Sequence, residues 1–417
     1  MLRRRGGRLS GDGVGPWETE DRDARRLARL HAELVDEFVP LPVDGPAGRA
    51  LLTELFYALH PPVHEGRVPA YGAVVHLVAG DGDVPAASSR LDHRPDVELI
   101  GARLDATMQR MAADGRSTFV WRSAARPEGI LTLARSHYSE ADLVGLRERL
   151  GDVVVIQRSL EGRVRAVTSE GVVIWTGVDW VFKPVANSYL APLARLLPGA
   201  DPDVLDALLE LCVHGLSAKG VGATLVWWLE DSHPEGIDGA MAQSAYSLTV
   251  TDRRHHPALL NILSQVDRAV VVRRTGELKA VDVALLTSGE AEARVSAWGG
   301  TRHSSARRYS YDQHRSVVFV VSADGPVSVF VDGASAAQVR VDPCRLGFTI
   351  ARLEPDSEGD VVPCPSCKRE LLVDVTDVPG WAGGPEVLAC PVCDEPIVVD
   401  AYRAAIRGPV KLPAPQA

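Results

Sequence analysis

The chain has 417 residues, of which 46% are hydrophobic and 24% are charged, and its 45 basic and 55 acidic residues give a formal net charge of -10. These values exclude a wholly disordered or fibrous chain, and the length predicts two or three domains. The acidic balance argues against a protein that neutralises many phosphates of a nucleic acid. Apolar runs such as Val317–Val321 are far shorter than the ~20 residues of a membrane helix. We therefore expect a cytoplasmic protein without membrane contact.

The first 200 residues predict a tail followed by an α/β or α+β domain. Residues 1–20 are rich in Gly and Arg without apolar periodicity, which is typical of a disordered tail. Residues 21–200 alternate helical and extended patterns, and we assign them to an N-terminal domain. Its expected helices span 24–38, 96–112 and 139–150, and its expected strands span 72–79, 117–121, 153–157 and 172–176.

Residues 201–345 predict a second domain, an α/β fold in which helices flank a mixed sheet. Asp201 and Pro202 have the residue types of an N-cap and a first helical turn. The pattern predicts helices at 202–216, at 257–265 and from 302 onward. The expected strands are 222–229, 269–274, 277–286, 294–298, 316–323 and 327–331.

The last region, 346–417, contains the strongest local motif in the sequence. Two Cys-Pro-x-Cys pairs, separated by residues 368–389, comprise Cys364, Cys367, Cys390 and Cys393. Four thiolates at this spacing predict a small zinc ribbon, although iron binds to the same type of site. Because cysteines fill all four positions, the Zn²⁺ is expected to be structural and not catalytic. The five basic and seven acidic side chains of 361–417 do not favour nucleic-acid binding.

A second motif, Gly299-Gly-Thr-Arg-His-Ser304, lies between a predicted strand and a predicted helix. The two glycines allow close approach of a ligand to the backbone, and Thr301 has the residue type of a helix cap. The N–H groups at a helix start bind anions, and Arg302 and His303 add donors. This chemistry suits a phosphate, although such a turn is often only a good cap.

The stretch Gly300–Phe330 resembles the diadenylate cyclase domain found in the DNA-integrity-scanning protein and its membrane-bound relatives. The family's Gly-Thr-Arg-His-Arg signature corresponds to residues 300–304, and its Val-Val-Ser segment corresponds to 320–322. The upstream Asp-Gly-Ala motif corresponds to 267–269, and the Gly-Ala strand start corresponds to Gly222 and Ala223. The matches occur in the same order as in the family across 210–335.

The resemblance implies that two ATP molecules are condensed into cyclic di-AMP, a signalling nucleotide, with release of two pyrophosphates. It implies that Asp267 binds Mg²⁺ or Mn²⁺ and that Arg302 and His303 act with it in catalysis. It also implies nucleotide contacts from Gly222, Ala223, Ala269, Gly300, Thr301, Ser304 and Ser322. Because each domain carries one ATP, a homodimer or larger homo-oligomer is implied.

The N-terminal domain is similar in position to the sensory modules that precede many cyclases of this family. A regulatory role with an unknown ligand is therefore expected for 21–200. The DNA-binding helical elements of the DNA-scanning member have no counterpart in this sequence, so that function is not transferred.

The sequence departs from the family at two positions, Arg268 for Gly and Ser304 for Arg. Arg268 is a long side chain beside the nucleotide, and Ser304 removes a positive charge. These departures keep open a degenerate sensor that binds ATP or cyclic di-AMP without turnover. A zinc-ribbon adaptor for nucleic acid or protein is a further alternative.

Overall fold

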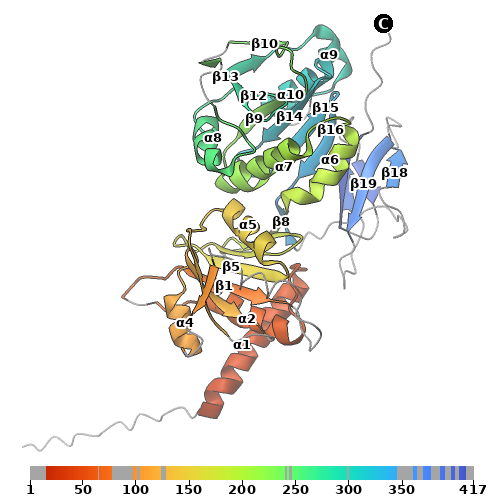
Figure 1. Cartoon of the computed structure of the whole chain (residues 1–417). Helices are drawn as coiled ribbons and strands as arrows, with labels where there is room; N and C mark the ends of the chain where they lie inside the picture. Colours follow the sequence, from red (N-terminus) through yellow and green to blue (C-terminus); the bar gives the residue numbers. More distant parts are fainter. Residues whose placement is uncertain are drawn as a thin grey trace, which may run out of the picture.

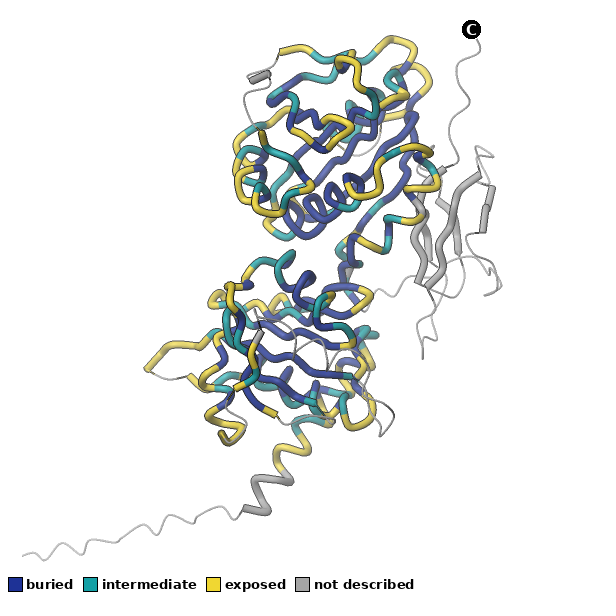
Figure 2. The backbone as a smooth tube through the Cα atoms, viewed as in Figure 1, coloured by how far each residue is buried: buried dark blue, intermediate teal, exposed yellow. Residues whose placement is uncertain are grey.

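The structure is a computed structural model that describes residues 16–63, 65–77, 97–100, 104–123, 128–239, 242–243, 247–297, 300–344, 360–363, 370–376, 386–389, 396–399 and 403–409. Its described residues form two large sheets, each flanked by helices (Figure 1). Buried backbone concentrates in the centre of these two sheets (Figure 2). The predicted mixed α/β fold is therefore confirmed for both large domains.

The first sheet belongs to the N-terminal domain and has the strand order β17-β8-β7-β6-β5-β1-β3-β4-β2. Only the β1–β3 pair is parallel among its described pairings. Its elements are α1 (Pro16–Asp36), α2 (Gly45–Leu59), β1 (Tyr71–His76), β2 (Val97–Ile100), α4 (Ala106–Ala112), β3 (Thr118–Arg122), β4 (Gly129–Leu133), α5 (Glu140–Leu150), β5 (Val153–Arg158), β6 (Val164–Val167), β7 (Gly171–Trp175) and β8 (Trp180–Pro184).

Each face of the first sheet packs against helices. Along β5, Val154 and Ile156 join the core formed with α1 and α2, whereas Val153 and Val155 join the core formed with α5. Successive side chains of a strand point to opposite faces, so a strand covered on both sides is apolar throughout.

The second sheet has the order β10-β13-β12-β9-β14-β15-β16, with β11 also paired to β13. Helices α6, α7 and α8 cover one face, and α10 covers the other. The elements are η1 (Ala186–Tyr189), α6 (Leu190–Leu196), α7 (Pro202–Glu210), the π-helix η2 (Leu211–Leu216), η3 (Ser217–Lys219), β9 (Ala223–Trp228), β10 (Ile237–Asp238), β11 (Ala242–Gln243), η4 (Arg253–His255), α8 (His256–Leu263), β12 (Ala269–Val272), β13 (Leu278–Leu285), α9 (Gly289–Arg294), α10 (Thr301–Asp312), β14 (Ser316–Val321), β15 (Val327–Val331) and β16 (Ala334–Val339).

The chain returns to the first domain after the second sheet. Strand β17 (Asp342–Pro343) pairs antiparallel with β8 and so lengthens the first sheet. Cys344, next in sequence, is buried in the core of the first sheet, whereas Cys212 is buried in that of the second. The two domains are thus joined both before and after the second sheet.

Four of the predicted elements need correction. Helix α1 begins at Pro16, so residues 16–20 are helical and do not belong to a tail, while 1–15 lie outside the described residues. The predicted helix 96–112 is strand β2 followed by α4, because Asp105 caps α4 by accepting from Met108 N at 2.9 Å. The predicted helix 202–216 becomes a π-helix after Glu210. The predicted strand 294–298 is not formed in its described part, and α9 ends at Arg294.

The C-terminal region has a three-stranded sheet of β18 (Asp360–Pro363), β19 (Glu370–Thr376) and β22 (Arg403–Pro409), with β22 next to β16. A separate pair consists of β20 (Glu386–Ala389) and β21 (Pro396–Val399). The four predicted zinc cysteines lie outside the described residues, so the zinc ribbon remains a prediction. No helix in the described part of the chain has the length and apolarity needed to cross a membrane.

Candidate functional site

Three segments of the second domain meet at one edge of its sheet. Gly222 directly precedes β9, Asp267 lies just before β12, and Ser322 directly follows β14. Because β9 and β12 are parallel and β14 is antiparallel to β9, these three positions share an edge. The structure thus brings together residues that are up to 100 positions apart in the sequence.

Arg302, in the first turn of α10, connects two of these segments. Its Nη2 lies 2.9 Å from Asp267 Oδ1 and 3.5 Å from the Asp267 carbonyl oxygen. A Cβ atom on Gly222 would lie 2.5 Å from Arg302 Nη1, so the absence of a side chain there leaves room for the guanidinium. The Asp267 side chain is 97% exposed, and its carboxylate is therefore accessible to a ligand.

His303 follows Arg302 in α10 and contacts Ser322, which directly follows β14. Its Nε2 is 3.5 Å from Ser322 Oγ, and its ring meets Phe330 edge-on with centroids 6.2 Å apart. Burial lowers the pKa of His303, and the charge of Arg302 lowers it further. The imidazole is consequently neutral near pH 7 and can act as a hydrogen-bonding group.

The N-terminus of α10 has the properties of an anion site. Gly300 is the N-cap, so the prediction that Thr301 caps this helix is wrong; Thr301 is the first helical residue and is exposed. Among the described residues no side chain caps the helix, and its first turn contains no acidic residue. A Cβ on Gly300 would meet no described atom within 4 Å, so the described residues do not crowd the start of the helix, where backbone N–H groups favour an anion.

The remaining predicted residues divide into buried and peripheral positions. Ala223 and Ala269 begin β9 and β12 and are 3% exposed, which fits close packing at the edge. Ser304 Oγ lies 3.3 Å from the Gly300 carbonyl and adds no charge. Arg268 Nη1 lies 3.5 Å from the position of a Cβ on Gly239, so this guanidinium lies beside the end of β10.

The donor set at this edge fits one type of metal ion. The described residues contain no group of three or more His, Cys, Asp and Glu that could hold an ion alone. Mg²⁺ retains water and is commonly bound by one or two carboxylates together with substrate phosphates. The exposed Asp267 carboxylate fits such an ion, which a nucleotide would help to hold.

A buried polar cluster at the interface between the two domains was not predicted. Glu140, the first residue of α5, forms an ion pair with Lys183 of β8 and accepts from His214 Nδ1 of η2 at 2.9 Å. Lys183 Nζ donates to the Val213 carbonyl at 3.0 Å, and the Ala186 N–H donates to His214 Nε2 at 3.1 Å. Because Nε2 accepts from the Ala186 N–H, Nδ1 is the nitrogen that donates to Glu140. A lone lysine in the apolar strand 180–184 is the only sequence signal of this cluster.

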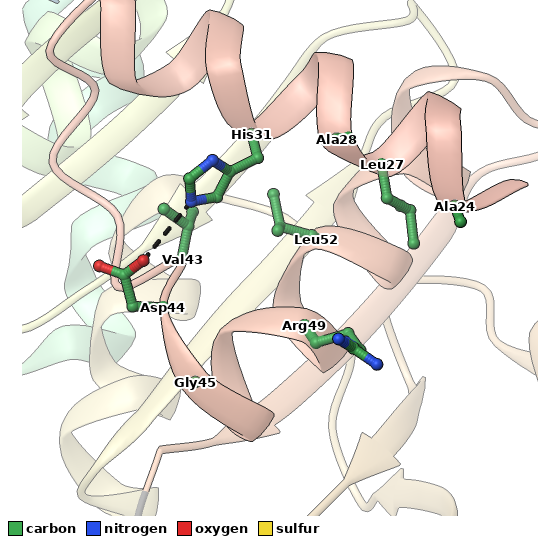
Figure 3. Close-up of a pocket in the computed structure, with 9 residues that line it drawn as sticks. All are labelled: Ala24, Leu27, Ala28, His31, Val43, Asp44, Gly45, Arg49 and Leu52. Atoms are coloured by element: carbon green, nitrogen blue, oxygen red, sulfur yellow. Dashed lines mark hydrogen bonds and ion pairs between the residues drawn. The ribbon is translucent and has the colours of Figure 1, made fainter.

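Two hollows are lined by described residues of the first domain. One, of about 610 Å³, lies between α1 and α2 and is shown in Figure 3, where His31 Nε2 is 3.5 Å from Asp44 Oδ1 across its rim. Its other lining residues are mainly small or apolar, with Arg49 as its one cation. The second, of about 540 Å³, lies beside the β5–β6 hairpin and is lined by four arginines.

The mixed α/β sheet, the N-terminus of α10 and the cluster around Arg302 form an edge with features that suit a nucleotide. Comparison with family models agrees: residues 210–335 match the family described as "DisA bacterial checkpoint controller nucleotide-binding", the DAC domain. Residues 28–183 match the family described as "Probable sensor domain DACNK". The chain therefore contains a region that matches the DAC domain, preceded by a region that matches the DACNK sensor domain.

Comparisons with individual proteins are less informative. A search of the curated proteins gives no match. Among solved structures, a hypothetical membrane spanning protein from Bacillus cereus is 18% identical, with 38% of this chain and 89% of that chain covered. Its TM-score of 0.24 is too low to support any argument about this protein.

Proposed function

We propose that the second domain is a diadenylate cyclase that condenses two ATP molecules into cyclic di-AMP and two pyrophosphates. The observation that carries the proposal is the position of Arg302, which lies between Gly222 and Asp267 in the first turn of α10. The resemblance to the cyclase family assigns a nucleotide to this same edge. The product would act as a signalling nucleotide under control of the first domain.

In the proposed reaction, the 3′-hydroxyl of each ATP attacks the α-phosphate of the other, and pyrophosphate leaves in both steps. The N–H groups of α10 and the Arg302 guanidinium hold the triphosphate in line for attack. The neutral His303 and Ser322 position the nucleotide from the β14 side. Ala223 and Ala269, small buried residues at the starts of β9 and β12, would allow the nucleotide to approach the backbone at this edge. Asp267 would hold Mg²⁺ or Mn²⁺, which supplies positive charge beside the reacting groups.

The reaction requires two active sites that face each other. Each domain offers one α10 N-terminus and one Asp267, so a single chain can present only one ATP. A homodimer or larger symmetric homo-oligomer therefore belongs to the proposal.

A nucleotide sensor without turnover is the second candidate function. It is favoured by the ion pair between Asp267 and Arg302, which already occupies the carboxylate, and by Ser304, which adds no cation. Such a protein would bind ATP or cyclic di-AMP at the same edge. Replacement of Arg268 by Gly and Ser304 by Arg would restore turnover if these two departures had abolished it.

The test is incubation of the purified chain with ATP and Mg²⁺ or Mn²⁺, followed by chromatographic separation of the products. We expect cyclic di-AMP from the wild type, none from Asp267→Asn, and an unchanged yield from Asp231→Asn. Asp231 is a matched control because it is an exposed aspartate beyond the opposite end of β9. ATP binding without product would support the sensor, and absence of both would refute a nucleotide site.

A further inference from the structure

The cavity of about 540 Å³ in the first domain lies on the face of the first sheet that α5 covers. Along β5 and β6, Gln157 is paired with Arg165, and Arg163 and Arg165 share a face because they are two residues apart. Gln157 donates to the Gly115 carbonyl at 2.6 Å and so forms the buried floor. Arg116 and Tyr138 border the same cavity from the loops before β3 and α5.

Four arginines line this cavity, against two carboxylates. Arg116 and Arg163 are exposed at its mouth, whereas Arg165 is half-buried. Arg158 is bound elsewhere, since its Nη1 donates to the Ala58 carbonyl at 2.9 Å. The Asp114 carboxylate is also engaged, because it accepts from three backbone N–H groups of its own loop.

Arg165 is the residue that points most directly to a ligand. Its Nε is buried and has no hydrogen-bond partner within the described part of the chain. Burial lowers the pKa of Arg165, since the guanidinium is separated from water. A buried donor without a hydrogen-bond partner is costly, and an anion in the cavity would accept from it. Glu140 and Glu161 already act on the Arg165 charge, so the unmet need at this residue is the hydrogen bond of Nε.

From this arrangement we propose that the cavity binds a small molecule that carries at least one phosphate group. The volume is within the range of pockets that bind small ligands, 300–1,000 Å³. Arginine forks match phosphate oxygens in pairs, and several arginines around one cavity suit a doubly charged phosphate better than a single carboxylate. The proposal gives the sensor domain a ligand class and does not depend on cyclase activity.

The position of Arg165 also places this ligand near the domain interface. Arg165 interacts electrostatically with Glu140, the residue that pairs with Lys183 and His214. An anion beside Arg165 would therefore change the field at the cluster that joins the sensor to the second domain.

The experiment is hydrogen exchange of the full chain measured by mass spectrometry, with inorganic phosphate, AMP or citrate as the probe. We expect phosphate or AMP to protect residues 155–166. The phosphate or AMP concentration that gives half-protection should rise roughly tenfold in Arg165→Gln and in the exposed variant Arg163→Gln, because each loses a charge-assisted donor. Arg67→Gln, an exposed arginine of the same domain outside the cavity, should behave as the wild type.

Protection by inorganic phosphate would show that the phosphate ion is sufficient for binding in the cavity. Protection by AMP alone would show that the ligand is an organic phosphate. Protection by citrate alone would overturn the phosphate assignment. Protection only at the start of α10, or none, would overturn the site itself. Because the readout is local to 155–166, its failure is distinct from failure of the cyclase, which Asp267→Asn tests separately.

Discussion

At the scale of single residues, the site combines a charged outer pair with a neutral inner histidine. Arg302 and Asp267 are accessible to a ligand, whereas His303 is packed against Phe330. The buried position explains why His303 is held neutral while Arg302, which cannot lose its proton, provides the charge.

The lowered pKa of His303 leads to a pH prediction. The unfolded chain takes up a proton at an ordinary histidine pKa near 6.5, whereas the folded chain takes it up only at lower pH. Protonation therefore favours unfolding, and this residue makes the folded state lose stability as the pH falls below about 6.5.

Thermal unfolding between pH 5 and 8 should show this loss in the wild type. We expect the His303→Gln variant to lose less stability over the same range, because glutamine does not titrate. A control, His60→Gln, replaces an exposed histidine and should follow the wild type. Parallel curves for the wild type and His303→Gln would contradict the prediction.

Sequence reasoning named the candidate site residues because the family motifs occur in order along the chain, and the structure brings Gly222, Asp267 and Ser322 to one edge of the sheet. Sequence reasoning could not locate Glu140, Lys183 and His214, whose contacts join α5, β8 and η2. Such pairs depend on how two domains dock, which hydrophobic periodicity within one segment does not specify. Arg165 was missed for a related reason. The sequence shows an arginine in a strand, but only the fold shows that this arginine pairs with Gln157 and lines a cavity.

At the scale of elements, the π-helix η2 places the second domain against the first. Its residues continue α7, so the sequence pattern predicts one helix through 202–216. The change from α-helix to π-helix after Glu210 is not apparent in the spacing of the apolar residues. His214 and the Val213 carbonyl, both within η2, provide the contacts to Glu140 and Lys183. π-helices are rare and often occur at functional positions.

The Glu140–Lys183 pair lies in the first domain and contacts Val213 and His214 of η2, so it should stabilise the folded chain where the two domains meet. Burial raises the pKa of Glu140, but the Lys183 charge and the His214 hydrogen bond outweigh it and lower the pKa to about 2. The pair is therefore fully effective above the ordinary glutamate pKa of 4.5 and is lost as the pH falls toward 2.

Glu140→Gln should reduce the free energy of unfolding by about 3–5 kcal/mol, since it leaves Lys183 buried without its counter-charge. Denaturant unfolding at pH 7 measures the effect. The double variant Glu140→Gln with Lys183→Met should recover most of the loss, because it removes both charges. Equal stabilities of the wild type and the single variant would show that the pair does not stabilise the folded chain.

The C-terminal module supplies a prediction about metal content. Four thiolates at the spacing of 364–393 are expected to bind one zinc ion per chain, and this ion should provide much of the folding energy of so short a segment. Elemental analysis of the purified chain should find zinc at this ratio.

Cys390→Ser should lose the ion and increase proteolysis beyond residue 345. Cys344→Ser should retain it, since Cys344 is buried in the core of the first sheet. Detection of iron instead of zinc would change the identity of the expected metal. A wild-type chain without bound metal would refute the predicted metal-binding ribbon.

At the scale of the whole molecule, the chain places a sensor domain in direct contact with a nucleotide-binding domain. The contact uses a strand pair, β17 with β8, and the buried cluster around Glu140. The strand pair and the cluster lie on elements that also contribute to the core of the first domain. Because α5 contacts η2 directly and η2 continues α7, a conformational change in the first domain would reach these elements. The arrangement is consistent with regulation of the proposed cyclase by the N-terminal domain.

The most direct test of the proposed function is the stoichiometry of the products formed from ATP by the wild-type chain. Cyclisation at two facing sites predicts two pyrophosphates for each cyclic di-AMP, and a specific activity that falls when dilution separates the chains. Quantifying both products across a range of protein concentrations measures this. One pyrophosphate per linear dinucleotide, or pyrophosphate with AMP alone, would contradict a diadenylate cyclase.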